Sequence, residues 1–515
     1  MSETAVPAGP ELERELWRVG RELADAMAHP SRQPLRALDD RAMELAASDR
    51  ELRAALFRFV DVVPACRSLD DLARHLVSYL REVDEPPPPL AAAMRVSGTR
   101  AGRAALGAAA AAGVRHLAHR FIVGETPEAA MGTLRSLWES GVACSVDLLG
   151  EATVTAEEAD RYAARCAHAI ERLSRETASW PPREVLESDP EGPVPRANLS
   201  VKVSALTPVL RPGAPRRGQL DAAARLRPLL ALARRVGAHV HIDMESLDLR
   251  DAVLGLALDL LSEPELADGP SAGVVLQAYL RDSPQQLEQI LDWAGRVRRS
   301  PPLTVRLVKG AYWDHELIQA RQHGWEVPVF LDRRDCDRNF EALTRRLLAA
   351  RPLVRVAVAS HNLRSVAHAI AANRLSGAGD SALELQVLRG LGDDLGRALA
   401  RRGHRVRAYC PVGDLVSGMA YLVRRLLENT SNDSFLFARA HGASLEELLA
   451  APGGSADPPT PCEPAPARAR SAASKPAGSA SAGIASGRPG RTPDASAAAL
   501  GQAGRTGAAS AGGAS

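Results

Sequence analysis

Charged and aromatic side chains interrupt an apolar stretch near the middle of the chain, at residues 305–313. The stretch reads Val-Arg-Leu-Val-Lys-Gly-Ala-Tyr-Trp, with Arg306 inside the apolar run and Lys309 at its end. Burying an arginine is costly unless it is paired or faces a ligand. Gly310 allows the backbone to come close to another group, and the two aromatic residues add flat surfaces beside the cations. Taken alone, an edge strand with a structural ion pair explains the stretch equally well.

Eight short apolar segments alternate with helix-length segments in the middle of the chain. Capping patterns mark helix starts between them, such as Thr126 before Pro127 and Thr155 with Glu158. Repeated strand–helix units predict a parallel (β/α)8 barrel, with a doubly wound open sheet as the alternative. The predicted strands cover residues 143–148, 198–203, 238–242, 273–277, 303–308, 354–358, 383–386 and 406–408.

Polar residues are rare in these segments and gather where the predicted strands end. In a parallel barrel the active site forms where the carboxyl ends of the strands meet. A single polar residue at a strand end is usually a helix cap, but several on successive strands predict an active site. The residues in such positions are Lys202, Asp243, Gln277, Arg306, Lys309, Ser360, His361, Asn362, Glu384 and Tyr409.

The composition of this set narrows the chemistry. It is rich in lysine and arginine and lacks the paired carboxylates of a glycosidase. The chain has no His-Glu-x-x-His or Cys-x-x-Cys spacing. His239 and His241 are expected to alternate across their strand, so that one of them faces the interior. We therefore expect no metal site, and a zinc hydrolase is disfavoured. The spacing of Gly390, Gly392 and Gly396 departs from a dinucleotide fingerprint and predicts a tight loop before a helix.

A second informative stretch lies at residues 421–429, Tyr-Leu-Val-Arg-Arg-Leu-Leu-Glu-Asn. Tyr421 shares one face of the predicted helix with Arg424 and Arg425, three and four residues further on. Two neighbouring guanidinium groups are suited to grip a carboxylate in bidentate fashion. Surface salt bridges on an amphipathic helix are the alternative explanation.

Segments of different composition flank the predicted barrel, which we place at residues 126–450. Residues 1–125 are expected to form a helical arm and packing domain, because apolar residues keep a helical spacing from Leu12 to Leu23 and Ser68 can cap a helix. Residues 451–515 consist largely of Ala, Gly, Ser, Pro and Arg and contain no aromatic residue, which predicts a disordered tail.

Charge, cysteine content and hydropathy limit the partners and the compartment. The formal net charge of +2 argues against a nucleic-acid partner. The six cysteines are scattered, as is typical of reduced thiols in a cytosol. No secretory signal is visible, and the longest apolar run, 104–114, is too short to span a bilayer. We expect a cytoplasmic protein, and these features are compatible with its peripheral contact with the inner face of the membrane.

Several of these motifs together resemble a proline dehydrogenase domain of the proline utilization A type. They are Lys202 within Ser-Val-Lys-Val-Ser-Ala, the segment 306–313, Ser360-His361-Asn362, the segment 421–429, and Asp-Leu-Leu-Gly-Glu-Ala at 147–152. The resemblance covers about residues 120–445, and the upstream helices are similar to the arm and helical domain of that group. It implies an FAD-dependent (β/α)8 barrel that oxidises L-proline to Δ1-pyrroline-5-carboxylate and passes the electrons to a membrane quinone.

The resemblance also implies a role for each site residue. The catalytic residues would be Asp243, Arg306, Lys202 and Tyr409, with Arg306 beside the flavin N5 and Asp243 orienting Tyr409. The substrate would contact Lys202, Tyr409, Tyr421, Arg424, Arg425 and Glu151; the two arginines and Lys202 would hold its carboxylate. The FAD would contact Met244, Gln277, Arg306, Val308, Lys309, Gly310, Ala311, Ser360, His361, Asn362 and Glu384. A carboxylate clamp positions the ring, and a cation near N5 favours the charge that develops there.

The chain departs from this group in three places. Larger enzymes of this type continue into an aldehyde dehydrogenase domain, so here we expect the product to be released or passed to a separate pyrroline-5-carboxylate dehydrogenase. No DNA-binding segment precedes Glu11, and no transcriptional role is expected. Residues 330–334, Phe-Leu-Asp-Arg-Arg, replace a segment that carries Thr and Lys near the FAD in many relatives. The alternatives are a flavin-free scaffold for a separate aldehyde dehydrogenase and an oxidase of another imino acid, such as hydroxyproline.

Overall fold

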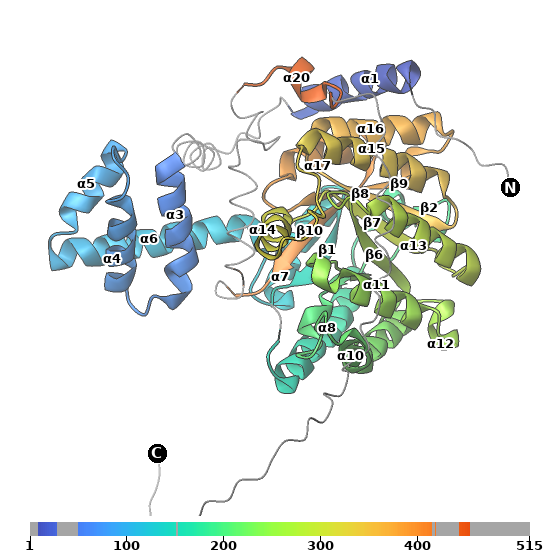
Figure 1. The fold of residues 1–515 in the computed structure, drawn as a ribbon, viewed down its shortest axis with the longest axis horizontal. Helices are drawn as coiled ribbons and strands as arrows, with labels where there is room; N and C mark the ends of the chain where they lie inside the picture. Colours follow the sequence, from blue (N-terminus) through green and yellow to red (C-terminus); the bar gives the residue numbers. More distant parts are fainter. Residues whose placement is uncertain (1–8, 28–49, 151–152, 415–417, 419–441, 454–515) are drawn as a thin grey trace, which may run out of the picture. The chain divides into compact units, whose positions relative to one another are not determined.

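Eight parallel strands close into a barrel (Figure 1). The computed structural model describes residues 9–27, 50–150, 153–414, 418 and 442–453. The order around the barrel is β1-β10-β9-β8-β7-β6-β5-β4, so the predicted (β/α)8 barrel is confirmed and the open sheet is wrong. The strands are β1 (Val142–Leu148), β4 (Asn198–Val201), β5 (His239–Ile242), β6 (Ser271–Gln277), β7 (Leu303–Val308), β8 (Val354–Ala359), β9 (Leu383–Leu388) and β10 (Arg405–Val412).

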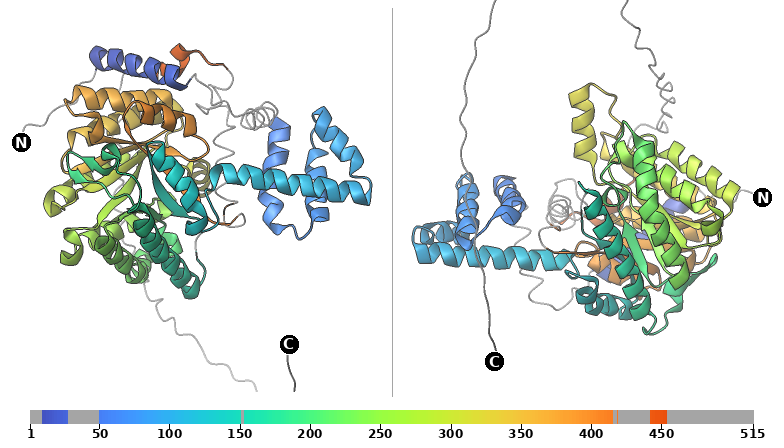
Figure 2. Two further views of the ribbon diagram at one scale, coloured as in Figure 1. Left: turned by 180° about the vertical axis from the view of Figure 1, so that it is seen from behind. Right: turned by 90° about the horizontal axis from the view of Figure 1, so that it is seen from below.

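Helices follow the strands along the chain and surround the barrel (Figure 1, Figure 2). The predicted starts at Thr126 and Thr155 are confirmed, and Thr155 forms a reciprocal capping box with Glu158. The predicted loop before a helix is also confirmed, with Gly390 at a φ of 86°. The helices are α7 (Pro127–Glu139), α8 (Ala156–Thr177), α9 (Glu184–Glu187), α10 (Pro215–Val236), α11 (Leu247–Leu261), α12 (Pro264–Ala267), α13 (Ser283–Val297), α14 (Trp313–His323), α15 (Arg333–Ala349), α16 (Leu363–Leu375) and α17 (Asp393–Arg401), with the one-turn helices η2 (Val203–Ala205) and η3 (Asp380–Ala382). Another one-turn helix, η1 (Val63–Ala65), belongs to the N-terminal helices.

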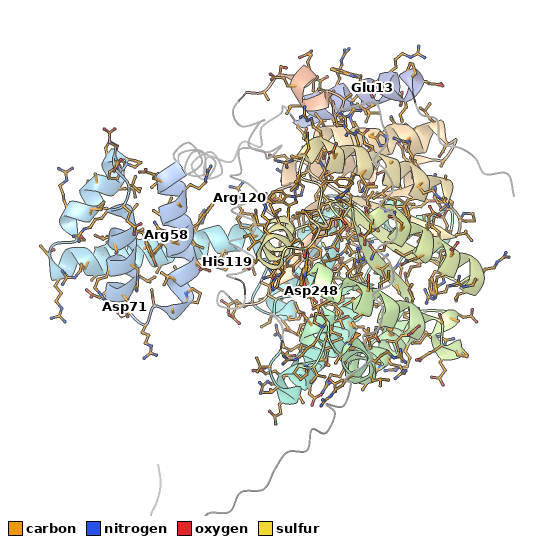
Figure 3. All side chains as sticks on the ribbon, viewed as in Figure 1. Glu13, Arg58, Asp71, His119, Arg120 and Asp248 are labelled. Carbon is orange, nitrogen blue, oxygen red and sulfur yellow. The ribbon has the colours of Figure 1, made fainter. Side chains whose placement is uncertain are left out.

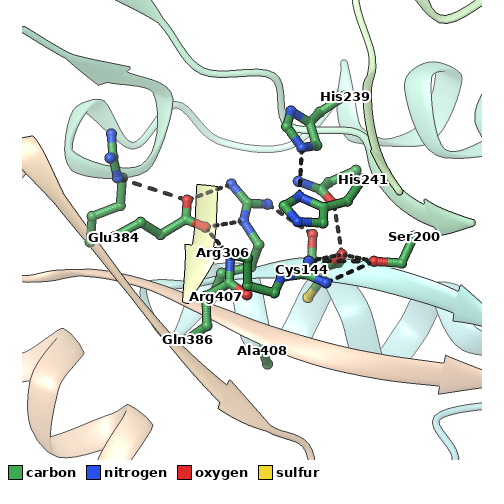
Figure 4. A network of polar contacts seen from close by, with 12 residues as sticks. Cys144, Ser200, His239, His241, Arg306, Glu384, Gln386, Arg407 and Ala408 are labelled. Carbon is green, nitrogen blue, oxygen red and sulfur yellow. Dashed lines mark hydrogen bonds and ion pairs between the residues drawn. The ribbon is translucent and has the colours of Figure 1, made fainter. Parts of the chain in front are cut away.

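The barrel strands present two chemically different faces, because successive side chains point to opposite sides. Val305 and Leu307 of β7 belong to the apolar core and have no exposed surface. Between them, Arg306 contacts polar groups of other strands, and Arg407 of β10 does the same. Barrel interiors are usually filled by branched apolar residues. Here charged side chains occupy much of the interior, as Figure 4 shows, and the strand patterns did not predict this.

A small antiparallel hairpin, also not predicted, lies at the amino ends of the barrel strands. It consists of β2 (Ser188–Asp189) and β3 (Gly192–Pro193). The carboxylate of Asp189 accepts hydrogen bonds from Arg355 of β8 at 3.0 Å and from Arg405 of β10 at 2.8 Å. The hairpin is therefore tied to this end of the barrel by buried charges.

The predicted N-terminal helices are present, and a group of them has an apolar cluster of its own. Leu52, Phe59 and Leu76 belong to this cluster. Figure 3 labels Arg58, which pairs with Glu82 at 2.7 Å. The predicted cap at Ser68 is confirmed. The helices of this group are α3 (Arg50–Val62), α4 (Leu69–Leu80), α5 (Pro88–Val96) and α6 (Arg100–Phe121).

Helices from the two ends of the described chain meet at α16. They are α1 (Pro10–Met27), whose predicted apolar face is buried, and α20 (Leu445–Leu449). Arg364, in the first turn of α16, donates to Glu13 of α1 at 2.7 Å and to the carbonyl oxygen of Leu449 at 2.8 Å. It also donates to Glu341 of α15 at 2.8 Å. One buried guanidinium group therefore joins four helices.

Arg364→Ala is expected to lower the free energy of unfolding by roughly 3–5 kcal/mol, because Glu341 would keep a buried charge without its partner. Denaturant titration measures this loss. The control is Arg227→Ala, which removes a more exposed bidentate pair with Glu263 and is expected to cost less than about 1 kcal/mol. Equal losses in the two variants would contradict the burial argument.

Two further expectations from the sequence concern the cysteines and membrane-spanning helices. The cysteines within the described ranges, Cys66, Cys144, Cys166, Cys336 and Cys410, are free thiols, and Cys462 lies outside those ranges. Within the same ranges, no helix is both long enough and apolar enough to cross a bilayer.

Candidate active site

A cavity of about 280 Å³ lies at the carboxyl ends of the strands. This is close to the lower end of the range typical of small-molecule sites. Predicted site residues from six strands and their following loops meet in it. They are Lys202, Asp243, Met244, Gln277, Arg306, Val308, Lys309, Gly310, Ala311, Ser360, His361, Asn362 and Tyr409.

Of the remaining predicted site residues, Glu384 lies within the described ranges and is not part of this lining. Glu384 lies in the barrel interior on the amino-terminal side, where it binds Arg407 with distances of 2.9 and 3.0 Å. Glu151, Tyr421, Arg424 and Arg425 lie outside the described residues, so their roles stay predictions. Nine lining residues were not predicted as site residues, namely Asp147, Glu245, Val275, Tyr312, Arg333, Ala359, Gln386, Val387 and Leu388.

Arg306 is the centre of a buried network that extends across the barrel (Figure 4). Its Nη1 atom donates to Asp243 Oδ1 at 2.9 Å, and its Nη2 atom donates to Ser145 Oγ at 3.3 Å. The guanidinium carbon lies 5.4 Å from the ring centroid of Tyr409. The Tyr409 hydroxyl donates to the other oxygen of Asp243 at 2.7 Å. One carboxylate therefore orients both the cation and the aromatic ring.

Lys202 supplies a second cation, held by a carboxylate from the neighbouring strand. Its ammonium group donates to Asp147, whose side chain is 1% exposed. Burial alone would lower the pKa of Lys202, but Asp147 and Asp243 outweigh it and the pKa is raised. The ammonium group therefore stays charged. Asp147 lies at the end of β1, so the same strand-end rule could have identified it as a site residue.

Two acidic groups of the cavity hold protons more tightly than usual. Burial raises the pKa of Asp243, against the influence of Arg306 and Lys202. Burial also raises the pKa of Glu245, whose carboxylate accepts from the backbone N–H of Ser204 at 3.2 Å and from its hydroxyl at 2.6 Å. Glu245 lies two residues after Asp243, in the loop that follows β5, so its position after a strand end could have identified it as a site residue.

The opposite side of the cavity is built from the loops after β7 and β8. Lys309 donates to Asp337, and its ammonium nitrogen lies 5.8 Å from the ring centroid of Phe340. His361 Nε2 accepts a hydrogen bond from the backbone N–H of Leu388 at 2.9 Å. A neutral ring that accepts at Nε2 carries its proton on Nδ1. This wall therefore combines one fixed cation with one oriented imidazole.

Two buried polar atoms of lining residues have no hydrogen-bond partner within the described part of the chain. They are Gln277 Oε1, which is an acceptor, and Arg306 Nε, which is a donor. Buried polar groups normally find partners. Apolar side chains such as Met244, Val275 and Val308 lie beside them. Apolar walls with one free donor and one free acceptor fit a flat heteroaromatic ring with polar edges, such as a flavin.

Below the cavity, His239 and His241 both face the barrel interior, so the expectation that one of them does is wrong. Residues two apart in a strand share a face. His241 Nε2 lies 3.2 Å from the carbonyl oxygen of Val274, so it carries a proton and donates. His241 Nδ1 then accepts from His239 Nε2 at 3.2 Å, and His239 Nδ1 accepts from the Ser271 hydroxyl at 2.8 Å. Each imidazole is thereby fixed in one tautomer.

These buried histidines predict a loss of stability in mild acid. Burial, together with Arg407, lowers the pKa of His239 to about 3, whereas an unfolded chain has a value of about 6.5. As the pH falls, the unfolded state therefore binds the proton first. The stabilisation that comes from keeping His239 neutral is complete above about pH 6.5. It declines by up to about 1.4 kcal/mol per pH unit as the pH falls toward about 3. Denaturant titrations from about pH 8 to about pH 5 measure the slope. His239→Gln is expected to make the slope shallower, and an unchanged slope would contradict this account.

The fold and the cavity define the class of protein: a parallel (β/α)8 barrel with a basic ligand site at the carboxyl ends of its strands. Comparison with known proteins narrows this class. Residues 130–438 match the family described as proline dehydrogenase, and residues 13–121 match the N-terminal domain of proline utilization A. The chain belongs to the proline dehydrogenase family, whose members are oxidoreductases.

Individual relatives agree with this assignment. The bifunctional protein PutA of Salmonella typhimurium is 35% identical over 353 residues, which are 66% of this chain and 25% of the relative. Proline dehydrogenase 1 of Bacillus subtilis subsp. natto is 28% identical over 64% of this chain and 92% of the relative. The crystal structure of proline utilization A from Bdellovibrio bacteriovorus, inactivated by N-propargylglycine, matches with a TM-score of 0.79 and 33% identity. That match covers 88% of this chain and 46% of the other, and the chain spans about a quarter of the bifunctional curated relatives.

Proposed function

We propose that this chain catalyses the flavin-dependent oxidation of L-proline to Δ1-pyrroline-5-carboxylate. One observation carries the proposal: Lys202, Arg306 and Tyr409 meet in one cavity, where Asp147 and Asp243 hold them. Cations and an aromatic ring suit a small imino acid with a carboxylate. Membership of the proline dehydrogenase family supports the same reaction.

In this proposal, the substrate binds between a cation and a ring. Lys202 pairs with the carboxylate of proline, because its ammonium group stays charged. The Tyr409 ring packs on the pyrrolidine and is kept in place by its hydrogen bond to Asp243. Arg424, Arg425, Tyr421 and Glu151 are proposed as further substrate contacts from the sequence resemblance alone.

FAD, when bound, supplies the hydride acceptor. Gln277 Oε1 and Arg306 Nε are available to its polar edges, and Arg306 adds the positive charge that favours electron density on the ring. Lys309, the residues of the Ser360-His361-Asn362 loop and the 308–311 backbone are proposed to hold the rest of the cofactor. Arg333 also lines the cavity. The altered segment 330–334 therefore still offers a cation on this side.

The later steps involve partners outside this chain. We propose that electrons pass from FAD to a membrane quinone and that a separate pyrroline-5-carboxylate dehydrogenase consumes the product. The bifunctional relatives support a linked second step. A cytoplasmic protein that contacts the inner face of the membrane fits both steps.

The visible spectrum of the purified protein, before and after anaerobic L-proline, tests the proposal. Flavin bands at about 450 nm are expected, and proline is expected to bleach them. Because a relative was inactivated by N-propargylglycine, prior treatment with that compound is expected to abolish the response to proline.

Other results would favour the alternatives. Flavin bands that persist with proline but bleach with hydroxyproline would show that the chain oxidises hydroxyproline and not proline. A protein that stays colourless after incubation with FAD would support the alternative that this chain is a flavin-free scaffold for a separate aldehyde dehydrogenase.

A further inference from the structure

A second cavity of about 20 Å³ lies in the barrel interior on the amino-terminal side of the strands. The hairpin β2–β3 contributes Asp189 to its wall, and the barrel strands contribute Arg355, Glu384, Arg405 and Arg407. A void of this size holds one water molecule or one small ion. Gln386 lines both this cavity and the larger one, so the two share a wall.

The charges around the small cavity do not balance. Three lining residues are cations (Arg355, Arg405 and Arg407), whereas two are anions (Asp189 and Glu384). Glu384 is ionised, because Arg407 and Arg405 overcome the effect of burial and lower its pKa to about 2. Two nearby residues, Arg351 and Glu191, add one charge of each sign. Among the residues that the structure describes, one positive charge is therefore left over.

The two histidines among the lining residues do not change this balance. His239 and His241 are neutral at ordinary pH, because burial and Arg407 lower the pKa of His239 to about 3, and burial and Arg306 lower the pKa of His241 well below its usual value. The side chains of Arg355 and Arg405 are only 5% and 3% exposed, so water screens the excess charge poorly. A buried charge without a counterion costs several kcal/mol.

Two donors at this cavity are also unsatisfied. Arg355 and Arg405 bind the two oxygens of the same Asp189 carboxylate, at 3.0 and 2.8 Å, so their guanidinium groups lie close together. The Nε atom of each is buried and has no hydrogen-bond partner in the described part of the chain. Arg405 Nε is 3.8 Å from Glu384, which is an ion pair too long for a hydrogen bond.

We propose that this cavity binds one small monovalent anion, of the chemical class of chloride. The ion balances the excess positive charge, and the Nε–H groups of Arg355 and Arg405 are the donors available to it. Phosphate and sulfate are too large for the cavity. The site is separate from the proposed proline chemistry, and neither its occupant nor its test depends on that reaction.

Two measurements on the purified full-length protein test the site. The first is the thermal midpoint in sodium chloride and in sodium gluconate at equal ionic strength, with gluconate as the anion too large to enter. Chloride is expected to raise the midpoint by roughly 2–4 °C relative to gluconate. The second is anomalous diffraction from bromide-soaked crystals, in which a peak is expected between Arg355 and Arg405.

A variant and its control make the thermal test specific. Arg405→Met removes the excess charge and one donor, so the difference between the two salts is expected to disappear. Arg227→Met alters an arginine that is paired on the surface, and this variant is expected to keep the difference between the two salts. Equal midpoints of the parent protein in both salts, or a bromide map without a peak in the cavity, would overturn the proposal. The diffraction test needs no variant, so it decides the question even if Arg405→Met fails to fold.

Discussion

Arg306→Ala is expected to slow reduction of the bound flavin by proline about 100-fold or more. The variant removes a buried cation that contacts both Asp243 and the Tyr409 ring, and losing a single such electrostatic contact typically costs that much in rate. Asp243 would also remain buried without its partner, so the free energy of unfolding is expected to fall by roughly 3–5 kcal/mol. Stopped-flow absorbance under anaerobic conditions measures the rate, and denaturant titration measures the stability.

Arg250→Ala separates the two effects. Arg250 makes a bidentate pair with Asp282 at 2.6 and 2.8 Å, is 7% exposed, and does not line the active-site cavity. Because the Asp282 carboxylate left behind is 46% exposed, this variant is expected to lose less stability than Arg306→Ala, while its flavin is reduced at the parent rate. Arg306→Lys keeps the charge without the guanidinium fork, and its rate of flavin reduction is expected to lie between those of the parent protein and Arg306→Ala. An unchanged rate of flavin reduction in Arg306→Ala would refute the assigned role.

Lys202→Met is expected to weaken proline binding about 10-fold to 100-fold, because a charged hydrogen bond to the substrate carboxylate is lost. Titration of the flavin spectrum with proline, and KM in a dye-coupled assay, measure this change. The variant also leaves Asp147 buried without its cation. The double variant Lys202→Met/Asp147→Asn is therefore expected to recover stability but not proline affinity.

Lys309→Met is the matched control within the same cavity. Lys309 is also paired with an aspartate, and its side chain is 22% exposed, compared with 17% for Lys202. It lies on the proposed cofactor side, so its loss is expected to weaken FAD binding and to leave the affinity for proline close to that of the parent. Equal effects of both lysine variants on proline affinity would show that Lys202 acts through general charge and not as a substrate contact.

The barrel could be predicted because its signals are local. A buried strand needs a short apolar run and a helix needs a cap, so all eight strands and the helix starts at Thr126 and Thr155 were visible in the chain order. The strand-end rule then located Lys202, Asp243 and Arg306 in one site. Asp147 ends β1 and obeys the same rule, so its absence from the predicted set was an omission and not a limit of the sequence.

Other features of the barrel interior were predicted wrongly or missed, each for a different reason. The prediction for His239 and His241 was wrong because it treated residues two apart as if they were neighbours across a strand. The hairpin β2–β3 was missed because each of its strands has two residues, too few to show a pattern. Glu384 was placed among the residues at strand ends, but it is the second residue of β9, the seventh barrel strand, and therefore lies on the amino-terminal side.

The sequence by itself determined the strand–helix order, the class of barrel and the basic character of the site, since all three follow from residue types along the chain. The tertiary structure decided which charges neutralise one another. Arg306 meets Asp243 across 63 residues, Lys202 meets Asp147 across 55, and Asp189 meets both Arg355 and Arg405. The physical reason is that closing the barrel places the inward faces of distant strands around one buried space. In that space, a charge is stable only beside its partner.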